Sequence, residues 1–265
     1  MADIAARLTT LTRLGFAARG LLYIVIALLV LTTGRAEDPS GALQTLGEGG
    51  GRILLGLMAA GFVAYGIWRL SDAAFDIERH GSDGKGLRER LGAGASGIVH
   101  LFLAWQAIRL MQGTADQGGS GAEQGAQSAL QLPGGGVLLV LGGLVLLGVG
   151  LFQLYRARKG SFLDHLEPQV ARQDWVRWTG RAGYAARGLV FLISGFFLVR
   201  AGLDEKASEA GGMAEALAWL TNPWDVLVAI GLLAFGLFSL IEARFRTLHQ
   251  VPVHGIGQKV RAQMH

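Results

Sequence analysis

Residues 13–23 read RLGFAARGLLY, and similar segments follow as RLGAGASGIVH at 90–100 and RAGYAARGLVF at 181–191. A second set also matches: AYGIWRLSDAAF at 64–75, GVGLFQLYRARK at 148–159 and AFGLFSLIEARF at 234–245. Self-similarity that returns in the same order along a chain is the sequence signature of structural repeats. The sequence therefore predicts three copies of one unit, each with an outgoing segment and a returning segment.

Each of these segments lies in an apolar run long enough to cross a membrane. The runs cover roughly residues 14–33, 53–71, 91–112, 136–155, 182–201 and 224–243. A helix rises about 1.5 Å per residue, so a run of about 20 residues spans a hydrocarbon layer about 30 Å thick, whereas buried strands are shorter. We predict an all-α polytopic membrane protein with six transmembrane helices. Since each unit has an even number of spans, the three units should share one orientation and a pseudo-threefold axis along the membrane normal.

The repeat also sets the expected unit boundaries. They are residues 1–83, 84–172 and 173–246, each with two transmembrane helices, followed by a cytoplasmic tail at 247–265. The first span follows two arginines and could be mistaken for a signal peptide. Because it has two counterparts deep in the chain, we expect it to be retained.

The distribution of basic residues predicts the orientation of the spans. The N-terminal arm, the loops after the second and fourth spans and the C-terminal tail hold most of the Lys and Arg, whereas the opposite loops hold few and are richer in acids. Loops rich in Lys and Arg stay on the cytoplasmic side. Both termini are therefore expected in the cytoplasm. Because orientation accounts for the basic residues, no nucleic-acid partner is expected.

Three features together resemble a known family. They are the RxGxxARG opening of the outgoing segments, the GALQTL stretch at Gly41, and the AYGIW and AFGLFSLIEARFR returning segments. They resemble bacterial membrane proteins of the domain-of-unknown-function family numbered 1206. The resemblance implies three copies of that domain in a bacterial cytoplasmic (inner) membrane, and it implies no activity. The middle copy departs most, with Ser96 in place of Arg19 and Arg187, and His100 in place of Tyr23 and Phe191.

No residue pattern in the chain predicts catalysis. The sequence contains no HExxH, no GxxxxGK[ST], no GxSxG and no Cys, which are the usual signs of zinc-protease, phosphate-binding, hydrolase and thiol chemistry. A single intramembrane His without a second ligand at suitable spacing also argues against a metal or haem site. We therefore expect a protein without enzymatic activity, without a cofactor and without a metal ion.

Candidate ligand-binding residues are polar groups at membrane depth, where burial is costly. Five qualify: Arg19, Ser96, Arg187, Tyr23 and His100. The arginines lie about 9 Å inside the helix starts, a distance that a snorkelling side chain can cover without any function. Alternatively, their guanidinium groups bind an anionic lipid headgroup or solute. His100 is either a packing residue or a proton relay or ligand contact, and it should be hydrogen-bonded in both cases, as should Tyr23.

Two carboxylates close the same ends of the returning segments. Asp72 and Glu242 occupy equivalent positions, with Arg156 between them in the middle copy. We predict that they form structural ion pairs with arginines at the starts of neighbouring helices, namely Arg13, Arg90 and Arg181.

Two functions remain open at this point. The first is a scaffold or accessory subunit that packs against itself or another membrane protein through small-residue helix faces. The second is a binding or transport module for a small molecule, lipid or ion, with a central site between the three repeats. A dry, filled centre favours the first, and a wet central cavity favours the second.

Overall fold

The structure is a computed structural model that describes residues 2–34, 36, 39–48, 51–77, 81, 83–113 and 121–247. In these ranges it contains six helices that are long and apolar enough to cross a membrane, which confirms the predicted spans. They are α1 (Ala2–Thr33), α3 (Arg52–Phe75), α4 (Gly84–Met111), α6 (Gly135–Lys159), α8 (Asp174–Leu203) and α10 (Trp224–Phe245). The predicted tail lies outside the described residues, except for Thr247.

Short helices precede the returning spans. They are α2 (Pro39–Glu48), α5 (Gly121–Leu130) and α9 (Met213–Trp219), and the connection between α6 and α8 holds the 3-10 helix η1 (Ser161–His165) and α7 (Pro168–Ala171). A further 3-10 turn, η2 (Ala207–Glu209), follows α8. At the start of α9, the backbone N–H of Gly212 donates to the Glu215 carboxylate at 2.6 Å. This contact satisfies a free donor of the kind that every helix start leaves unpaired.

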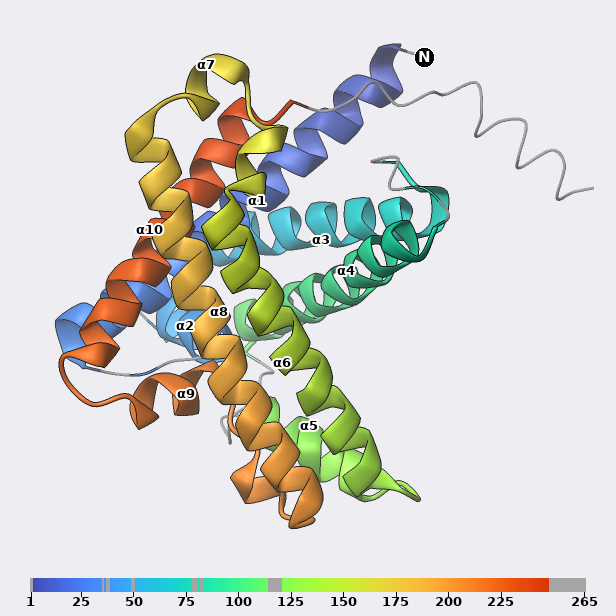
Figure 1. The fold of residues 1–265 in the computed structure, drawn as a ribbon, viewed down its shortest axis with the longest axis vertical. Coiled ribbons are helices and arrows are strands. Elements are labelled where there is room, and N and C mark those ends of the chain that lie inside the picture. Colours follow the sequence, from blue (N-terminus) through green and yellow to red (C-terminus); the bar gives the residue numbers. More distant parts are fainter. Residues whose placement is uncertain are drawn as a thin grey trace, which may run out of the picture.

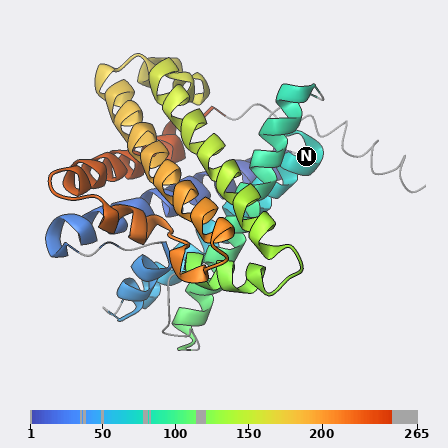
Figure 2. The ribbon, with the colours of Figure 1, turned by 60° about the horizontal axis from the view of Figure 1, so that its bottom comes forward.

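The spans pack side by side in the order α6, α8, α10, α1, α3, α4 (Figures 1 and 2). Within the first and third repeats, the outgoing helix packs on the returning helix, in the pairs α1·α3 and α8·α10. Successive repeats are joined by the pairs α3·α4 and α6·α8, and the pair α10·α1 joins the third repeat to the first. In the described part of the chain, α4 and α6 make no comparable contact with each other, so the two helices of the middle repeat are separated.

Each helix pair that joins two repeats crosses at equivalent glycines. A Cβ on Gly20 would lie 2.8 Å from the carbonyl oxygen of Gly236, a Cβ on Gly97 would lie 3.0 Å from that of Gly66, and a Cβ on Gly188 would lie 3.0 Å from that of Gly150. Small residues let membrane helices approach backbone to backbone. The crossings therefore use the same repeat positions three times. An exact threefold relation between the repeats stays a prediction.

The returning helix of the middle repeat differs in sequence at the position where the other two repeats close. Gly61 of α3 lies against Ala18, and Gly231 of α10 lies against Ala186, so a Cβ at either glycine would clash. The equivalent residue of α6 is Val145, whose side chain is 65% exposed. A branched side chain at this position keeps two helix axes further apart than a glycine does, so a helix that packs on this face lies at side-chain distance rather than at backbone distance.

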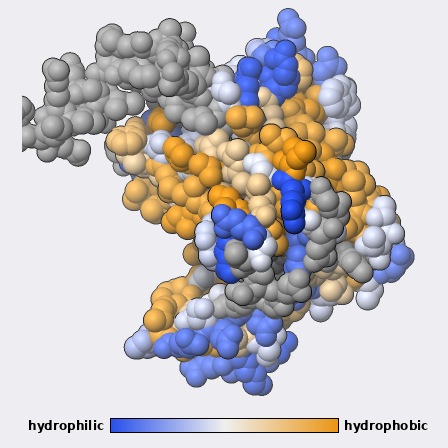
Figure 3. All heavy atoms as spheres, turned by 180° about the vertical axis from the view of Figure 1, so that it is seen from behind, coloured by the Kyte–Doolittle hydropathy of each residue, from blue (hydrophilic) through white to orange (hydrophobic). Residues whose placement is uncertain are grey.

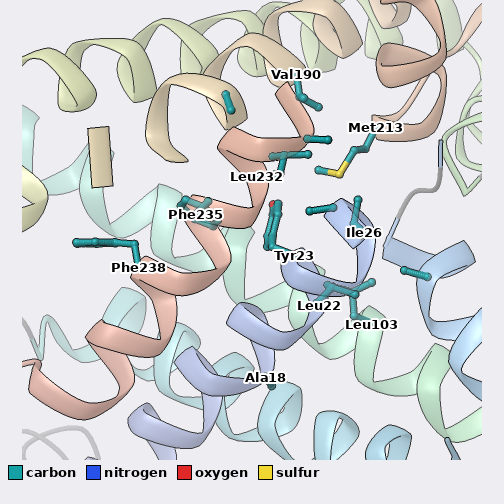
Figure 4. Packing of buried hydrophobic residues seen from close by; sticks show 14 of the residues in the cluster. Ala18, Leu22, Tyr23, Ile26, Leu103, Val190, Met213, Leu232, Phe235 and Phe238 are labelled. Atoms are coloured by element: carbon teal, nitrogen blue, oxygen red, sulfur yellow. The ribbon is translucent and has the colours of Figure 1, made fainter. Parts of the chain in front are cut away.

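The largest hydrophobic cluster fills the region around α1 and α10. Tyr23 of α1 contacts Phe235 of α10 ring to ring, with 4.8 Å between ring centroids, among Leu22, Leu232 and other apolar side chains (Figure 4). On the face that Figure 3 shows, hydrophobic side chains cover broad parts of the surface, and hydrophilic ones gather at the top and bottom of the view and in a smaller patch near its middle. This distribution fits a protein whose flanks face lipid.

Candidate functional site

Arg19 is a buried arginine, and its donors are used internally. Its Nε donates to Ser239 Oγ at 3.2 Å, Nη1 donates to Tyr65 Oη at 3.2 Å, and Nη2 donates to Glu242 Oε2 at 2.6 Å. All three nitrogens thus have partners, which lie on α3 and α10. This arginine does not snorkel to the headgroups; it pairs inside the bundle.

Glu242 completes this cluster from α10. Its second carboxylate oxygen accepts from Arg246 Nη1 at 3.1 Å, and the carboxylate is only 2% exposed. A buried carboxylate held between two guanidinium groups has the charge-assisted hydrogen bonds that burial requires. The network joins the first repeat to the third.

Arg187 of α8 approaches the same region from the third repeat. Its Nε donates to Tyr23 Oη at 2.9 Å. The guanidinium carbon of Arg187 lies 4.9 Å from the centroid of the Phe235 ring, and that of Arg19 lies 5.1 Å from it. Arg187 is half-buried, and among the described residues its two Nη atoms have no hydrogen-bond acceptor.

His100 lies on α4 and faces the bundle. Its Nδ1 is 2.7 Å from the backbone oxygen of Ser96, and since a carbonyl only accepts, Nδ1 carries the proton in this contact. The imidazole ring is 4.3 Å from the Tyr65 ring, centroid to centroid. His100 and Tyr23 are therefore both hydrogen-bonded, as expected. Ser96 enters the site through its backbone oxygen.

The predicted ion pairs need a correction. Both carboxylates are paired, but Glu242 binds Arg19 and Arg246, and Asp72 binds Arg69 of its own helix at 3.4 Å. The expected partners Arg13, Arg90 and Arg181 are placed differently.

The arginines at the helix starts contact backbone oxygens or solvent instead. Arg90 donates to the carbonyls of Ala73 and Ala74 at 2.8 and 3.1 Å, and Arg181 lies 3.5 Å from the carbonyl of Arg158. Arg13 is exposed. The last carbonyls of a helix have no partner within that helix, so they attract a cation that reaches the helix end.

The structure thus brings four of the five candidate residues into one connected region. Tyr65 contacts both Arg19 and His100, and Phe235 contacts Arg19, Arg187 and Tyr23. Sequence reasoning did not single out these two aromatic residues. Their signal was available, because Tyr65 and Phe235 both stand directly before a crossing glycine in equivalent returning segments.

A cavity of about 470 Å³ lies at the opposite membrane side, near the end of α1 and the start of α10. One carboxylate oxygen of Asp225 is buried without a hydrogen-bond partner. This carboxylate stands in the first turn of α10, where the helix dipole favours a negative charge. The lining residues are Val30, Gly34, Ala36, Leu217, Ala218, Leu220 and Asp225.

Comparisons with known proteins agree with the repeat. The family described as Domain of Unknown Function (DUF1206) matches three segments, residues 14–76, 91–160 and 182–246. The chain is also 30% identical over 247 residues to the uncharacterised protein YxxB of Bacillus subtilis (strain 168), which covers 88% of this chain and 90% of that protein. No solved structure matches the chain.

Proposed function

The chain belongs to the DUF1206 family, whose name assigns no activity, and from its geometry we propose that it is a non-enzymatic scaffold subunit that self-associates through its middle repeat. The observation that carries this proposal is the separation of α4 from α6. In the first and third repeats the equivalent helices cover each other. The middle repeat leaves both faces without a partner from the described chain.

Burial at equivalent positions supports this reading of α4. The inner face of the outgoing helix is buried in the first and third repeats, at Gly15, Ala18 and Leu22 and at Gly183, Ala186 and Val190. The same positions of the middle repeat, Gly92, Ala95 and Val99, are exposed. In the other two repeats the returning helix covers these positions, so the pattern of the repeat predicts a helix over this face.

The returning helix α6 shows the same contrast. Tyr65 and Phe235 are 4% and 0% exposed, whereas the equivalent Val149 is 37% exposed. Val145, one turn away, is also exposed. An apolar face with buried counterparts in two sister repeats is the kind of surface that packs on another helix.

The occupant that fits best is a second copy of this chain. The face of α4 matches a helix of the α6 type, and the face of α6 matches a helix of the α4 type, because those are the partners in the closed repeats. Two copies inserted with the same orientation, related by a twofold axis along the membrane normal, would place α4 of each on α6 of the other. This arrangement satisfies both faces at once.

The interior gives less support to a transport role. Arg19, Glu242, Tyr23 and His100 are all buried and hydrogen-bonded to one another or to neighbouring groups. The hydrogen bonds of Arg19, Glu242 and Tyr23 join the first repeat to the third, and that of His100 lies within α4. A central substrate would have to displace these contacts.

Cysteine cross-linking tests the proposal, because the natural chain has no Cys. Val99→Cys and Val145→Cys proteins, carrying different tags, are mixed and reconstituted at low protein-to-lipid ratio, and mild oxidation should then give a mixed disulfide dimer. A matched control joins Leu57→Cys with Phe196→Cys, which are exposed on α3 and α8. Equal cross-linking of both combinations, or none of either, contradicts self-association through the middle repeat.

We also place the protein in the bacterial cytoplasmic membrane with both termini in the cytoplasm, because of the bias in its basic residues. A reporter that is active only in the periplasm should therefore be inactive when fused after His265. An active reporter would reverse the orientation.

A further inference from the structure

We propose that Arg156 and Arg187 bind a phosphate-bearing anion at the α6·α8 crossing, in the position that Glu242 holds at the α10·α1 crossing. The inference does not depend on self-association. It rests on a comparison of the three glycine crossings, in which Arg156 and Arg187 occupy the repeat positions of Glu242 and Arg19.

At the α10·α1 crossing, the chain itself supplies a carboxylate to the buried arginine. Arg19 of the outgoing helix faces Ser239 and Glu242 of the returning helix, and Glu242 bridges Arg19 and Arg246. One carboxylate is thus held between two guanidinium groups.

At the α3·α4 crossing, the outgoing helix has no cation at the position of Arg19. Ser96 stands at the position of Arg19, and the equivalents of Ser239 and Glu242 are Arg69 and Asp72. These two residues of α3 pair with each other. This crossing therefore needs no external charge.

At the α6·α8 crossing, the carboxylate is replaced by a cation. Arg187 is the outgoing arginine, and Gln153 and Arg156 stand at the positions of Ser239 and Glu242. Both arginines are half-buried. The side chain of Arg156 makes no hydrogen bond or ion pair with any residue that the structure describes, and the side chain of Arg187 makes only its hydrogen bond to Tyr23.

Tyr184 of α8 contacts Arg156. The Arg156 guanidinium carbon lies 4.8 Å from the centroid of the Tyr184 ring, and Tyr184 precedes Arg187 by three residues, about one turn of α8. The tyrosine is 3% exposed, and its hydroxyl has no hydrogen-bond partner within the described ranges. The Tyr184 hydroxyl, the Arg156 guanidinium and the two Nη atoms of Arg187 are thus donors for which the described residues supply no acceptor.

The chemistry of these donors selects a phosphate group. Unpaired cations at membrane depth are costly, and guanidinium groups bind phosphate oxygens through two parallel hydrogen bonds. The crossing also borders the lipid-facing side of α6, where Phe152 and Tyr155 are 44% and 54% exposed. The phosphate could thus come from an anionic lipid headgroup or from a soluble anion, and the experiment separates the two.

Native mass spectrometry of the full-length protein, released from nanodiscs of phosphatidylcholine with added phosphatidylglycerol, measures retained lipid. Arg156→Gln and Arg187→Gln should each weaken retention of phosphatidylglycerol about tenfold to a hundredfold, which is the range for one charged hydrogen bond. Arg158→Gln is the matched control, because it removes the same charge at an exposed position two residues further along α6. Equal losses in Arg158→Gln and Arg156→Gln would mean only general surface attraction and would overturn the proposal.

Arg156→Glu provides a second and opposite test. It copies Glu242 of the third repeat and so supplies Arg187 with an internal carboxylate. Retention of the anion should be lost while the melting temperature stays equal or rises, which also distinguishes lost binding from lost folding. Full retention in this variant would overturn the proposal.

The source of the phosphate is read from a parallel titration. If inorganic phosphate raises the melting temperature of the natural chain in pure phosphatidylcholine, and does not do so in Arg156→Glu, the ligand is a soluble anion. If only phosphatidylglycerol has this effect, the ligand is a lipid. If neither has it, the proposal is wrong.

Discussion

Arg19 Nη2 and Glu242 Oε2 lie 2.6 Å apart although 223 positions separate the two residues in the chain. The contact links the first span to the last and is almost completely shielded from solvent. No other ion pair joins α1 to α10 among the described residues. The Arg19–Glu242 pair therefore fixes the rotation of one helix against the other.

Loss of Arg19 should therefore be strongly destabilising. In Arg19→Met, Glu242 keeps only Arg246, and breaking a buried ion pair from one side typically costs about 3–5 kcal/mol. The free energy of unfolding in detergent micelles measures this loss. The double variant Arg19→Met/Glu242→Leu should lose less than the sum of the single variants, and a strictly additive result would argue against direct coupling.

The glycine crossings predict a contrast within a single helix. In Gly150→Val, the new side chain meets the carbonyl oxygen of Gly188, which lies 2.9 Å from the Cβ position, so α6 and α8 must separate. In Gly148→Val, the Cβ position has nothing within 4 Å. Overpacking typically costs about 1–3 kcal/mol. Thermal melting should show a clear loss for the first variant and almost none for the second; a loss of similar size in both would contradict backbone contact at Gly150.

Replacement of His100 should have little effect on stability. His100→Phe copies Phe191 of the third repeat and removes one contact to a backbone oxygen, so the expected change is under about 1 kcal/mol. Tyr65→Phe removes the hydroxyl that accepts from Arg19 and leaves a buried donor unpaired, at a cost of about 1–3 kcal/mol. Melting temperatures in the reverse order would assign His100 a role that the contacts do not show.

The open middle repeat should respond to a single side chain. Val145→Gly restores the residue type found at Gly61 and Gly231, and should let α4 and α6 approach within one chain. Spin labels at Ile98→Cys and Leu141→Cys, read by double electron–electron resonance, should then report a shorter distance. Leu144→Gly is the control, because it has the same backbone cost at an exposed neighbouring position. An unchanged distance in Val145→Gly would remove Val145 as the cause of the separation.

The spans and the repeat could be read from the sequence because both depend on local patterns. Apolar length defines a span, and the glycines that recur in each unit mark the helix crossings. The pairing of Arg19 could not be read in this way. Snorkelling and internal pairing both suit an arginine at that depth, and only the rotation of α10 places Glu242 and Ser239 beside it.

The separation of the middle repeat was likewise hidden in the sequence. Val145 is an ordinary residue for a lipid-facing helix, and its meaning appears only when Gly61 and Gly231 are seen against Ala18 and Ala186. The same holds for Arg156. Its position, equivalent to those of Asp72 and Glu242, suggested a group of structural ion pairs. In the structure, its side chain has no ion pair with a carboxylate of the described residues.

The packing order of the spans has a consequence for how the protein is made. The order α6, α8, α10, α1, α3, α4 corresponds to a circular permutation of the chain, in which the break falls between α4 and α5 and the natural termini are joined. The N-terminal half, α1 to α4, can thus assemble as soon as the ribosome has released it, and so can the half from α5 to α10. The docking of α10 on α1, the main contact between the halves, must wait for the last span. Final assembly in the membrane thus joins two preformed halves, and a nick in the middle repeat would leave both of them whole.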